Sequence, residues 1–425
     1  MRASLASSNP AAFASTATVT GLSLFTISSL CAVESLTGKD IKCDKASGLL
    51  VLENERQLYY IARVTNRLLA MNLQLLILDT LRSMPHWLLS LVAGRPLEID
   101  GNRLDINMQV LAKLSARGSN ASDGPPSVDD IRRTAAEFGE LNLPTVAGVS
   151  TEDTTIELLG NSLKVRIYRP ASDANPKPAV LFFHQGGLVI MDHLTDNHFC
   201  SLLAARCGAV VFSLDYRLCP ENTFPAPIED AKALWEHVQA FSDDYGVDPE
   251  RVALAGDSAG GLISSTLALI LRDEGGRQPK TLCLAYPWVT TYNENQPSLS
   301  SCANTFPLTA DTMHFFNSQV FPNDLNKDHP WANPLHAESL AGLPPTVIGT
   351  AGFDPIRDQG NAFASRLAES GNEVTHFCFE SLTHSYLMFG RVSNEAERAC
   401  ETLAIALSKR LKIPDPEDLS DQSAG

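Results

Sequence analysis

The nonapeptide VALAGDSAG, residues 252–260, decides the fold of this chain. Its first four residues form an apolar run typical of a buried strand, and residues 261–272 after it have the apolar composition of a buried helix. Ser258 therefore lies at the apex of a sharp strand-to-helix turn. The glycines on either side of it permit a backbone path that a Cβ would obstruct, and such a turn exposes the serine hydroxyl above a sheet. Ser258 is thus a candidate nucleophile.

A second turn that contains glycine follows the apolar run 179–183, which we expect to be another buried strand. The sequence there is HQGG, residues 184–187, and a glycine pair can aim successive backbone N–H groups into a cleft. Together with the N–H of Ala259, the N–H groups of Gly186 and Gly187 could bind the oxyanion of a tetrahedral intermediate. The alternative is an ordinary glycine-rich turn, and the neighbouring serine turn favours the oxyanion interpretation.

An acidic residue and a histidine follow two later strands. Residues 346–352 predict a parallel strand, and Asp354 comes shortly after it. The alternating run 373–379 predicts the next strand, and His384 lies in the loop beyond it. Functional side chains in open α/β sheets gather at such strand ends. The chain order of Ser258, Asp354 and His384 is the serine, acid, histidine order of α/β hydrolases.

Two other residues compete for the roles of acid and base. His376 precedes His384 closely, but the alternating pattern places it within the strand, so we expect a packed or surface-facing histidine there. Asp358 lies where the helix after the strand should already have begun. We expect it to be an N-terminal helix charge or the partner of Arg357. The sequence therefore favours His384 and Asp354.

Five motifs in order along the chain resemble the hormone-sensitive-lipase-like esterases, also called bacterial family IV esterases. They are HQGG at 184–187, DYRLCPE at 215–221 with FPAP at 224–227, GDSAG at 256–260, DPIRD at 354–358, and His384. The resemblance extends over about residues 97–412. It implies an α/β-hydrolase fold, which is a doubly wound, mostly parallel eight-stranded sheet with an N-terminal helical cap.

The family pattern implies a role for each matching residue. Ser258 is the nucleophile, His384 the general base and then acid, and Asp354 the group that orients and stabilises the imidazolium. The implied oxyanion donors are Gly186, Gly187 and Ala259. The mechanism needs neither a metal nor an organic cofactor.

Three departures from the pattern stand out. Gln185 occupies the position of the first glycine in the usual run, Cys219 stands where alanine is common, and Ser385-Tyr386 replaces the usual glycine and phenylalanine after the histidine. None of them removes a catalytic group. The geometry of the loop at Gln185 is open, because a residue with a Cβ does not adopt all the backbone angles that glycine does.

Arg217 and Glu221 allow two interpretations. They could clamp a substrate, or they could fix the loop after a strand through charge-assisted hydrogen bonds. In the family that the chain resembles this segment is structural, and we favour that interpretation.

The alternation of strand-like and helix-like segments predicts one catalytic domain over residues 151–412. Strands are expected near 154–158, 163–169, 179–183, 209–214, 251–255, 281–286, 345–350 and 373–379. Helices are expected near 194–206, 226–243, 260–273, 309–320, 357–370 and 393–411. Before this domain we expect a helical extension and cap over residues 51–150, with helical spacing at 105–118 and 128–139. Residues 1–50 are expected to be a disordered or targeting tail, and residues 413–425 a flexible tail.

The apolar stretch 59–92 could be taken for a membrane segment. Its central run 68–78 is shorter than the roughly 20 residues of a membrane span, and Asn72 and Gln74 interrupt it, so we expect a helix that packs on the core or cap. Membrane contact through residues 59–92 is an alternative that we do not favour. Residues 1–33 fit a secretory signal poorly, so we expect a cytoplasmic protein, with secretion or membrane association as the alternative.

Composition argues against several classes of partner. The formal net charge is −16, so nucleic acid, which needs many basic contacts, is not an expected partner. The nine cysteines lack paired or clustered spacing, which predicts free thiols and neither a zinc site nor a disulfide framework. The expected partner is a small-molecule ester, and a homodimer is compatible with the sequence.

We therefore expect a serine carboxylesterase that hydrolyses short-chain acyl esters through an acyl-enzyme intermediate. One alternative is an amide hydrolase or a longer-chain lipid hydrolase of the same family. Another is a ligand receptor on this fold, since the plant gibberellin receptors resemble the same family but lack its catalytic histidine. The presence of His384 disfavours the receptor.

Overall fold

The computed structural model describes residues 42–44, 49–51, 79–118, 127–172, 174–292 and 296–411. Residues 1–76 and 77–425 form two separate compact units. In the first unit, β1 (Lys42–Asp44) pairs antiparallel with β2 (Leu49–Val51). Most of the predicted tail 1–50, the apolar residues 59–78 and the predicted tail 413–425 lie outside the described residues.

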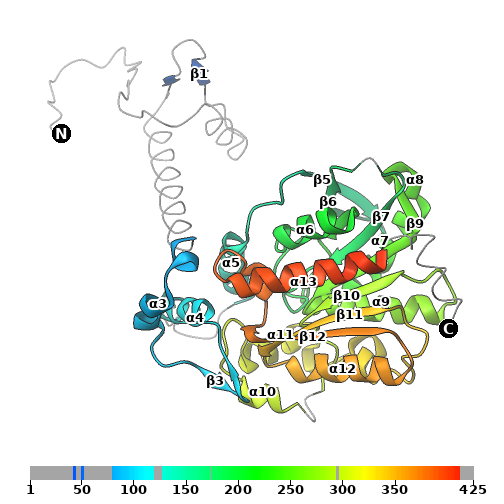
Figure 1. The fold of residues 1–425 in the computed structure, drawn as a ribbon. Coiled ribbons are helices and arrows are strands. Elements are labelled where there is room, and N and C mark those ends of the chain that lie inside the picture. Colours follow the sequence, from blue (N-terminus) through cyan, green and yellow to red (C-terminus); the bar gives the residue numbers. More distant parts are fainter. Residues whose placement is uncertain are drawn as a thin grey trace, which may run out of the picture. The chain divides into compact units, whose positions relative to one another are not determined.

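An eight-stranded sheet forms the centre of the second unit (Figure 1). Its strand order is β12-β11-β10-β9-β7-β8-β6-β5. The strands are β5 (Val149–Leu158), β6 (Asn161–Pro170), β7 (Lys177–Phe183), β8 (Val210–Leu214), β9 (Val247–Asp257), β10 (Thr281–Ala285), β11 (Thr346–Phe353) and β12 (Val374–Thr383). β6 pairs antiparallel with β5 and β8, and the other pairs in this sheet are parallel. The predicted mostly parallel sheet is confirmed.

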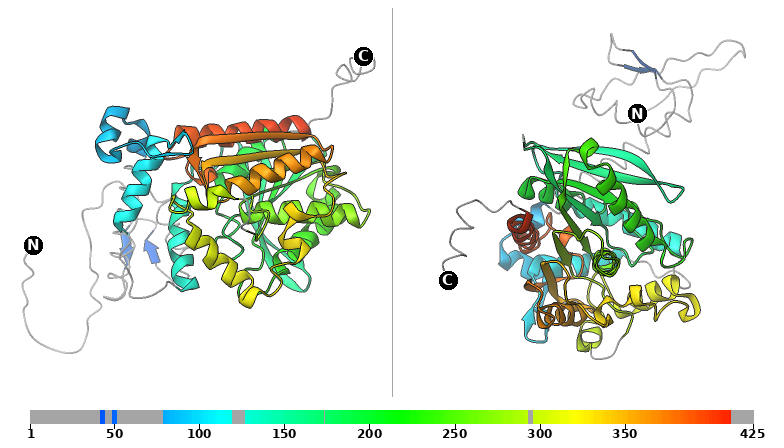
Figure 2. Two further views of the ribbon diagram at one scale, coloured as in Figure 1. Left: turned by 90° about the horizontal axis from the view of Figure 1, so that it is seen from below. Right: turned by 90° about the vertical axis from the view of Figure 1, so that its right-hand side faces the viewer.

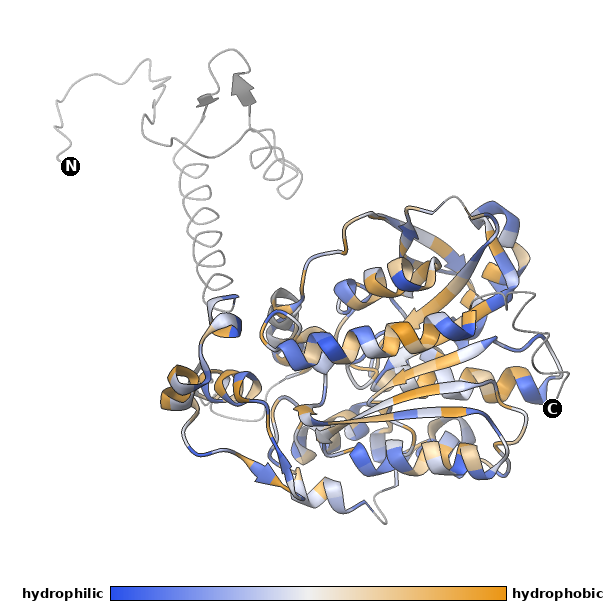
Figure 3. Ribbon diagram, in the orientation of Figure 1, coloured by the Kyte–Doolittle hydropathy of each residue, from blue (hydrophilic) through white to orange (hydrophobic). Residues whose placement is uncertain are grey.

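The central strands are apolar along their length because both faces of the sheet are covered. All residues of β8, β10 and β11 are buried. By contrast, much of β12, at one edge, alternates between half-buried and exposed side chains. Figure 3 shows the same contrast, with apolar strands inside and hydrophilic positions on the outer helix faces.

Helices cover both faces of the sheet (Figures 1 and 2). On one face lie α6 (Asn197–Cys207) and α13 (Asn394–Leu411). On the other lie α7 (Ala226–Ala240), α9 (Ala259–Asp273) and α12 (Arg357–Glu369). The other helices between β8 and β11 are α8 (Ser242–Tyr245), α10 (Pro297–Ser301) and α11 (Ala310–Val320). This arrangement is the doubly wound architecture that the sequence predicts.

Several strand boundaries differ from the sequence-based expectation, among them the start of β5 at Val149 instead of 154. Two more differences are at β9 and β12. β9 begins at Val247, before the expected start at 251, because Val247 already pairs with Lys177 of β7. β12 continues past the expected end at 379, because Thr383 pairs with Phe353 of β11 beyond an irregularity in the register. Main-chain pairing in both places extends through residues that have no apolar pattern. As a result, His384 comes directly after a strand.

Several helices and a short hairpin precede β5 in the second unit. They include α3 (His86–Ala93), the hairpin of β3 (Glu98–Ile99) and β4 (Asn102–Arg103), α4 (Ile106–Gly118) and α5 (Val128–Phe138). The backbone N–H of Asp105 donates to the carbonyl of Ser381 at 2.9 Å, which ties this segment to β12. None of the helices in the described part of the chain has the length and apolar character needed to cross a bilayer.

Candidate active site

Ser258 lies in a strained turn between β9 and α9. Its φ of 51° and ψ of −115° are unusual for a residue with a side chain. The turn also brings two backbones together, since a Cβ at Gly260 would overlap the carbonyl oxygen of Phe183 in β7. The Ser258 N–H donates to the carbonyl of Ala285 at 2.9 Å, and the Ser258 carbonyl accepts the N–H of Trp288 at 2.9 Å. Neighbouring strands and the glycine therefore hold the serine at the apex.

Three side chains from three strand ends form one chain of hydrogen bonds. His384 Nε2 lies 2.9 Å from Ser258 Oγ, and His384 Nδ1 lies 2.8 Å from Asp354 Oδ2. Asp354 Oδ1 accepts the N–H of Ile356 at 2.9 Å, which fixes the carboxylate. Ser258 is 7% exposed, His384 4% and Asp354 0%. This arrangement can move a proton from the serine hydroxyl to the imidazole while the carboxylate stabilises the imidazolium.

The predicted oxyanion donors are backbone N–H groups of buried residues beside this turn. Gly186 has a φ of 115° and Gly187 a φ of 60°, in the region that favours glycine. Among the described residues, no acceptor takes the N–H of Gly186, Gly187 or Ala259. Ala259 is the first residue of α9, where N–H groups have no partner within the helix. Because buried N–H groups are almost always bonded, these three groups, which have no acceptor among the described residues, are available to a negatively charged oxygen of a ligand.

Gln185 leaves the glycine turn intact. It is not among the residues with positive φ, so its Cβ is accommodated, and the left-handed conformation begins at Gly186. The preceding His184 ring stacks on Tyr216 with centroids 4.1 Å apart. Tyr216 Oη also donates to the His184 carbonyl at 2.8 Å. These contacts fix the start of the loop.

Neither competing residue joins the hydrogen-bond chain. His376 lies within β12 with Nε2 3.1 Å from the Thr350 hydroxyl, and burial lowers its pKa. Asp358, in the first turn of α12, accepts the N–H of Ser298 at 2.7 Å and pairs with Arg357 at 3.2 Å. Asp358 thus anchors the start of α10 to the start of α12.

Arg217 and Glu221 are held by different partners. Arg217 pairs with buried Asp230 of α7 at 2.7 Å. Glu221 pairs with Arg132 of α5 at 2.7 Å, and Arg132 also donates to the carbonyl of Val189 at 2.9 Å. The second set of contacts connects α5 to the loop that carries Gly186 and Gly187. Both arginines therefore make charge-assisted hydrogen bonds that fix loops.

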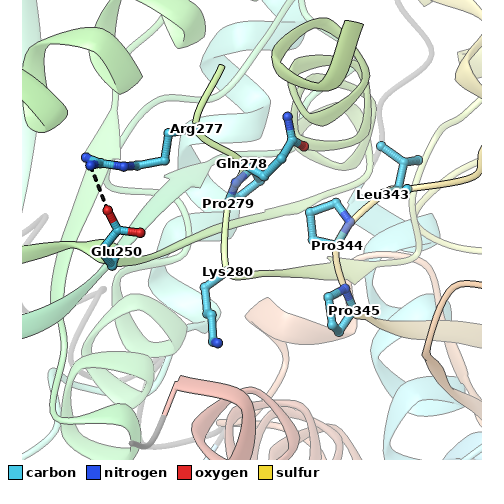
Figure 4. Close-up of a pocket in the computed structure, with 9 residues that line it drawn as sticks. Glu250, Arg277, Gln278, Pro279, Lys280, Leu343, Pro344 and Pro345 are labelled. Carbon is cyan, nitrogen blue, oxygen red and sulfur yellow. Dashed lines mark ion pairs between the residues drawn. The ribbon is translucent and has the colours of Figure 1, made fainter. Parts of the chain in front are cut away.

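A surface hollow of about 660 Å³ lies away from these residues (Figure 4). Its lining includes Lys280, just before β10, and Pro345, just before β11, and Arg277 pairs with Glu250 beside it at 2.7 Å. It is therefore at the amino ends of these parallel strands. Ligands in open α/β sheets bind outside the carboxyl ends, where Ser258 lies, so we do not assign this hollow to the site.

Several buried polar side chains behind the site have almost no sequence signal. Asp257 directly precedes Ser258, and its Oδ2 accepts from Tyr286 Oη at 2.8 Å. The Tyr286 ring lies against the His384 ring, with centroids 4.7 Å apart. Asp196, before α6, is also buried, and burial raises its pKa to about 7. Of these residues, only Asp257 could have been identified from the sequence, because it belongs to the GDSAG motif and the others do not.

Comparison with protein families and curated proteins agrees with this geometry. Residues 180–388 match a family described as alpha/beta hydrolase fold. The chain is 36% identical to the carboxylic ester hydrolase LipN of Mycobacterium tuberculosis, over 76% of this chain and 87% of that protein. It is 30% identical to an ethyl acetate hydrolase of Pseudomonas putida, over 67% of this chain and 90% of that protein.

Solved structures of esterases share the fold. A thermostable esterase from Pseudomonas putida aligns with a TM-score of 0.69 at 28% identity, over 73% of this chain and 98% of that one. An esterase from Pyrobaculum calidifontis aligns with a TM-score of 0.65 at 32% identity, over 72% of this chain and 98% of that one.

Proposed function

Because this chain belongs to the hormone-sensitive-lipase-like carboxylesterases of the α/β-hydrolase fold, we propose that Ser258, His384 and Asp354 catalyse its hydrolysis of short-chain acyl esters. The protein is a carboxylic ester hydrolase. The observation that carries the assignment of residues is the hydrogen-bond chain of these three side chains, beside three backbone N–H donors that have no acceptor in the part of the chain that the structure describes. A receptor would need neither feature.

In the proposed reaction, Ser258 Oγ attacks the ester carbonyl carbon while His384 Nε2 takes the hydroxyl proton. The carbonyl oxygen becomes an oxyanion and accepts hydrogen bonds from the N–H groups of Gly186, Gly187 and Ala259. Each of these hydrogen bonds lowers the barrier by about 3 kcal/mol. His384 then gives its proton to the departing alcohol, which leaves an acyl-serine. Water then attacks the acyl carbon while His384 Nε2 takes its proton. The bond from the acyl carbon to Ser258 Oγ breaks, the imidazolium returns the proton to Oγ, and the carboxylic acid leaves.

The preference for short acyl chains is supported by the burial of the nucleophile and by a ring that packs on the loop of the expected oxyanion donors. Ser258 and His384 are almost fully buried. The Phe316 ring of α11 lies against Gly187, where a Cβ would overlap it. Each methylene that fits contributes about 0.8 kcal/mol of binding until the pocket is full. One relative is named an ethyl acetate hydrolase, and the acyl group of ethyl acetate has two carbons.

Hydrolysis of p-nitrophenyl esters from acetate to palmitate, measured beside an arylamide, tests this proposal. We expect kcat/KM to peak between about two and eight acyl carbons, because a closed pocket limits the apolar chain that can be buried. Rates that climb to palmitate, with activation at an emulsion surface, would show a lipase. Preferential cleavage of the arylamide would show an amidase.

We also infer that residues 151–412 are the catalytic domain, that residues 51–150 supply its cap, and that the enzyme works in the cytoplasm. The contact of Arg132 with the loop at Val189 supports a cap beside the site. Among the described residues, the cysteines at positions 200, 219, 283, 302, 378 and 400 form no disulfide, which suits a reducing compartment. Esterase activity recovered in the membrane pellet or the culture medium after cell fractionation would contradict the location.

A further inference from the structure

Two of the departures from the family motifs, Gln185 and Ser385, contact each other. Ser385 Oγ donates a hydrogen bond to Gln185 Oε1, although 200 residues separate them. Gln185 immediately precedes Gly186 of the oxyanion loop, and Ser385 immediately follows His384. Both side chains are buried, with exposures of 3% and 7%. A direct hydrogen bond therefore joins the loop that carries the oxyanion donors to the loop that carries the general base.

The backbone at Ser385 indicates that its side chain matters. Its φ of 62° and ψ of 22° are left-handed, a conformation that glycine adopts freely and that a Cβ disfavours. Glycine would relieve this strain. The described contact of the Ser385 hydroxyl is the bond to Gln185, which stabilises the serine in this conformation.

The amide nitrogen of Gln185 continues the network to a buried carboxyl group. Gln185 Nε2 faces Asp196 Oδ1 at 3.5 Å. Burial raises the pKa of the Asp196 carboxyl to about 7. Burial, together with the charge of Asp196, also raises the pKa of the Asp257 carboxyl. The glutamine therefore has a bonded partner on each side, an acceptor carboxyl and a donor hydroxyl.

Asp257 lies beside the catalytic side chains. It is the chain neighbour of Ser258 and accepts from Tyr286 Oη at 2.8 Å. The Tyr286 ring packs against His384. The hydrogen bonds that start at Ser385, beside His384, thus pass the oxyanion loop at Gln185 and reach Asp196.

We propose that Gln185 and Ser385 are a matched pair of positioning residues that hold the oxyanion loop and the histidine loop in a fixed relative position. The inference rests on the proposed function of the same site. Gln185 acts through Gly186, and Ser385 acts through His384. Because the oxyanion donors and the imidazole are used in the transition state, loss of the pair should lower kcat and leave KM nearly unchanged.

A double-mutant cycle tests the pair. Gln185→Met keeps a side chain of similar length without its polar atoms, and Ser385→Ala removes only the hydroxyl. Each single variant should lower kcat for a butyrate ester by about tenfold, since each leaves a buried partner unbonded. The double variant should be about as active as the less active single variant, because the second change removes a bond that is already lost.

Two further variants separate the bond from other effects. Ser385→Gly relieves the left-handed strain but lacks the hydroxyl, so its kcat should fall as in Ser385→Ala. It changes no residue of the oxyanion loop, so it still tests the bond if Gln185→Met does not fold. Ser408→Ala is the matched control, because Ser408 is also 7% exposed and its Oγ makes one hydrogen bond, to the Arg206 carbonyl at 2.8 Å. Its kcat should equal that of the wild type.

Three results would overturn the inference while the ester hydrolysis stands. They are wild-type kcat in Ser385→Ala and Ser385→Gly, effects that multiply in the double variant, and a raised KM with unchanged kcat. A wild-type protein that hydrolysed none of the esters would contradict both the proposed function and this inference. This outcome is distinguishable from the other three, because it is measured on the wild type before any variant is made.

Discussion

Asp354 Oδ2 lies 2.8 Å from His384 Nδ1, although 30 residues separate the two in the chain. They meet because β11 and β12 are parallel neighbours, so the residues after the two strands emerge at the same edge of the sheet. Asp358, four residues after Asp354, is turned away and engaged by Ser298 and Arg357. The two aspartates of one motif therefore have different tasks, which variants can distinguish.

Asp354→Asn should lower kcat by about 10⁴-fold, because the amide no longer holds the imidazole in the required tautomer. Asp358→Asn should keep near-normal turnover and lose about 1 kcal/mol of unfolding free energy through its weakened bonds to the α10 and α12 segments. Steady-state kinetics and denaturant unfolding of both variants provide the comparison. A dead Asp358→Asn beside an active Asp354→Asn would reverse the assignment of the acid.

Ser258→Ala should abolish ester hydrolysis, with a loss of several orders of magnitude in kcat, and should retain the fold. An organophosphonate should label the wild type at Ser258, as peptide mapping by mass spectrometry can show. Substantial turnover in a verified, folded Ser258→Ala preparation would exclude this serine as the nucleophile.

Asp196→Asn should change the pH dependence of stability. Burial raises the pKa of Asp196 from an ordinary 3.8 to about 7, so between these values the folded state holds a proton that the unfolded state has released. The wild type therefore loses unfolding free energy as pH rises through this range, by up to about 1.4 kcal/mol per pH unit. Asparagine does not titrate, so the variant should gain stability relative to the wild type from pH 4 to pH 7.

Urea unfolding at several pH values, with the two proteins in the same buffers, measures this difference. If the unfolding free energies of the wild type and Asp196→Asn changed with pH in the same way, the Asp196 carboxyl would not take up a proton on folding.

Deletion of about the first 50 residues should leave butyrate-ester turnover and the core intact, because the Ala-, Ser- and Thr-rich start has no periodic apolar face. Deletion to about residue 95 should lower both the butyrate-ester turnover and the stability of the core. It removes buried Leu89 of α3, together with Asp79 and Arg82, which pair with Arg391 and Glu397. We expect Tm to fall by at least about 4 °C, the effect of a loss of 1–2 kcal/mol in a domain of this size.

Solubility, Tm and turnover of the two truncated proteins test this expectation. Loss of activity in the shorter deletion would make the tail part of the folded enzyme. An unchanged longer deletion would make residues 59–92 an accessory segment, and membrane association would then be the better interpretation.

The sequence by itself determined the fold class, the approximate positions of the strands along the chain and the candidate site. These follow from local chemistry, since apolar periodicity predicts strands and helices, and a serine between glycines after a strand predicts a sharp turn. The positions of Asp354 and His384 after consecutive parallel strands then predicted their meeting, because the carboxyl ends of such strands share one edge of the sheet.

Only the tertiary structure decided how Gln185 fits. Its backbone avoids the left-handed region because Gly186 adopts it, and its side chain meets Ser385. The carboxyl pair of Asp196 and Asp257 was equally hidden. Such contacts join side chains from distant loops, and they depend on how the loops pack above the sheet, which neither periodicity nor motif spacing along the chain records.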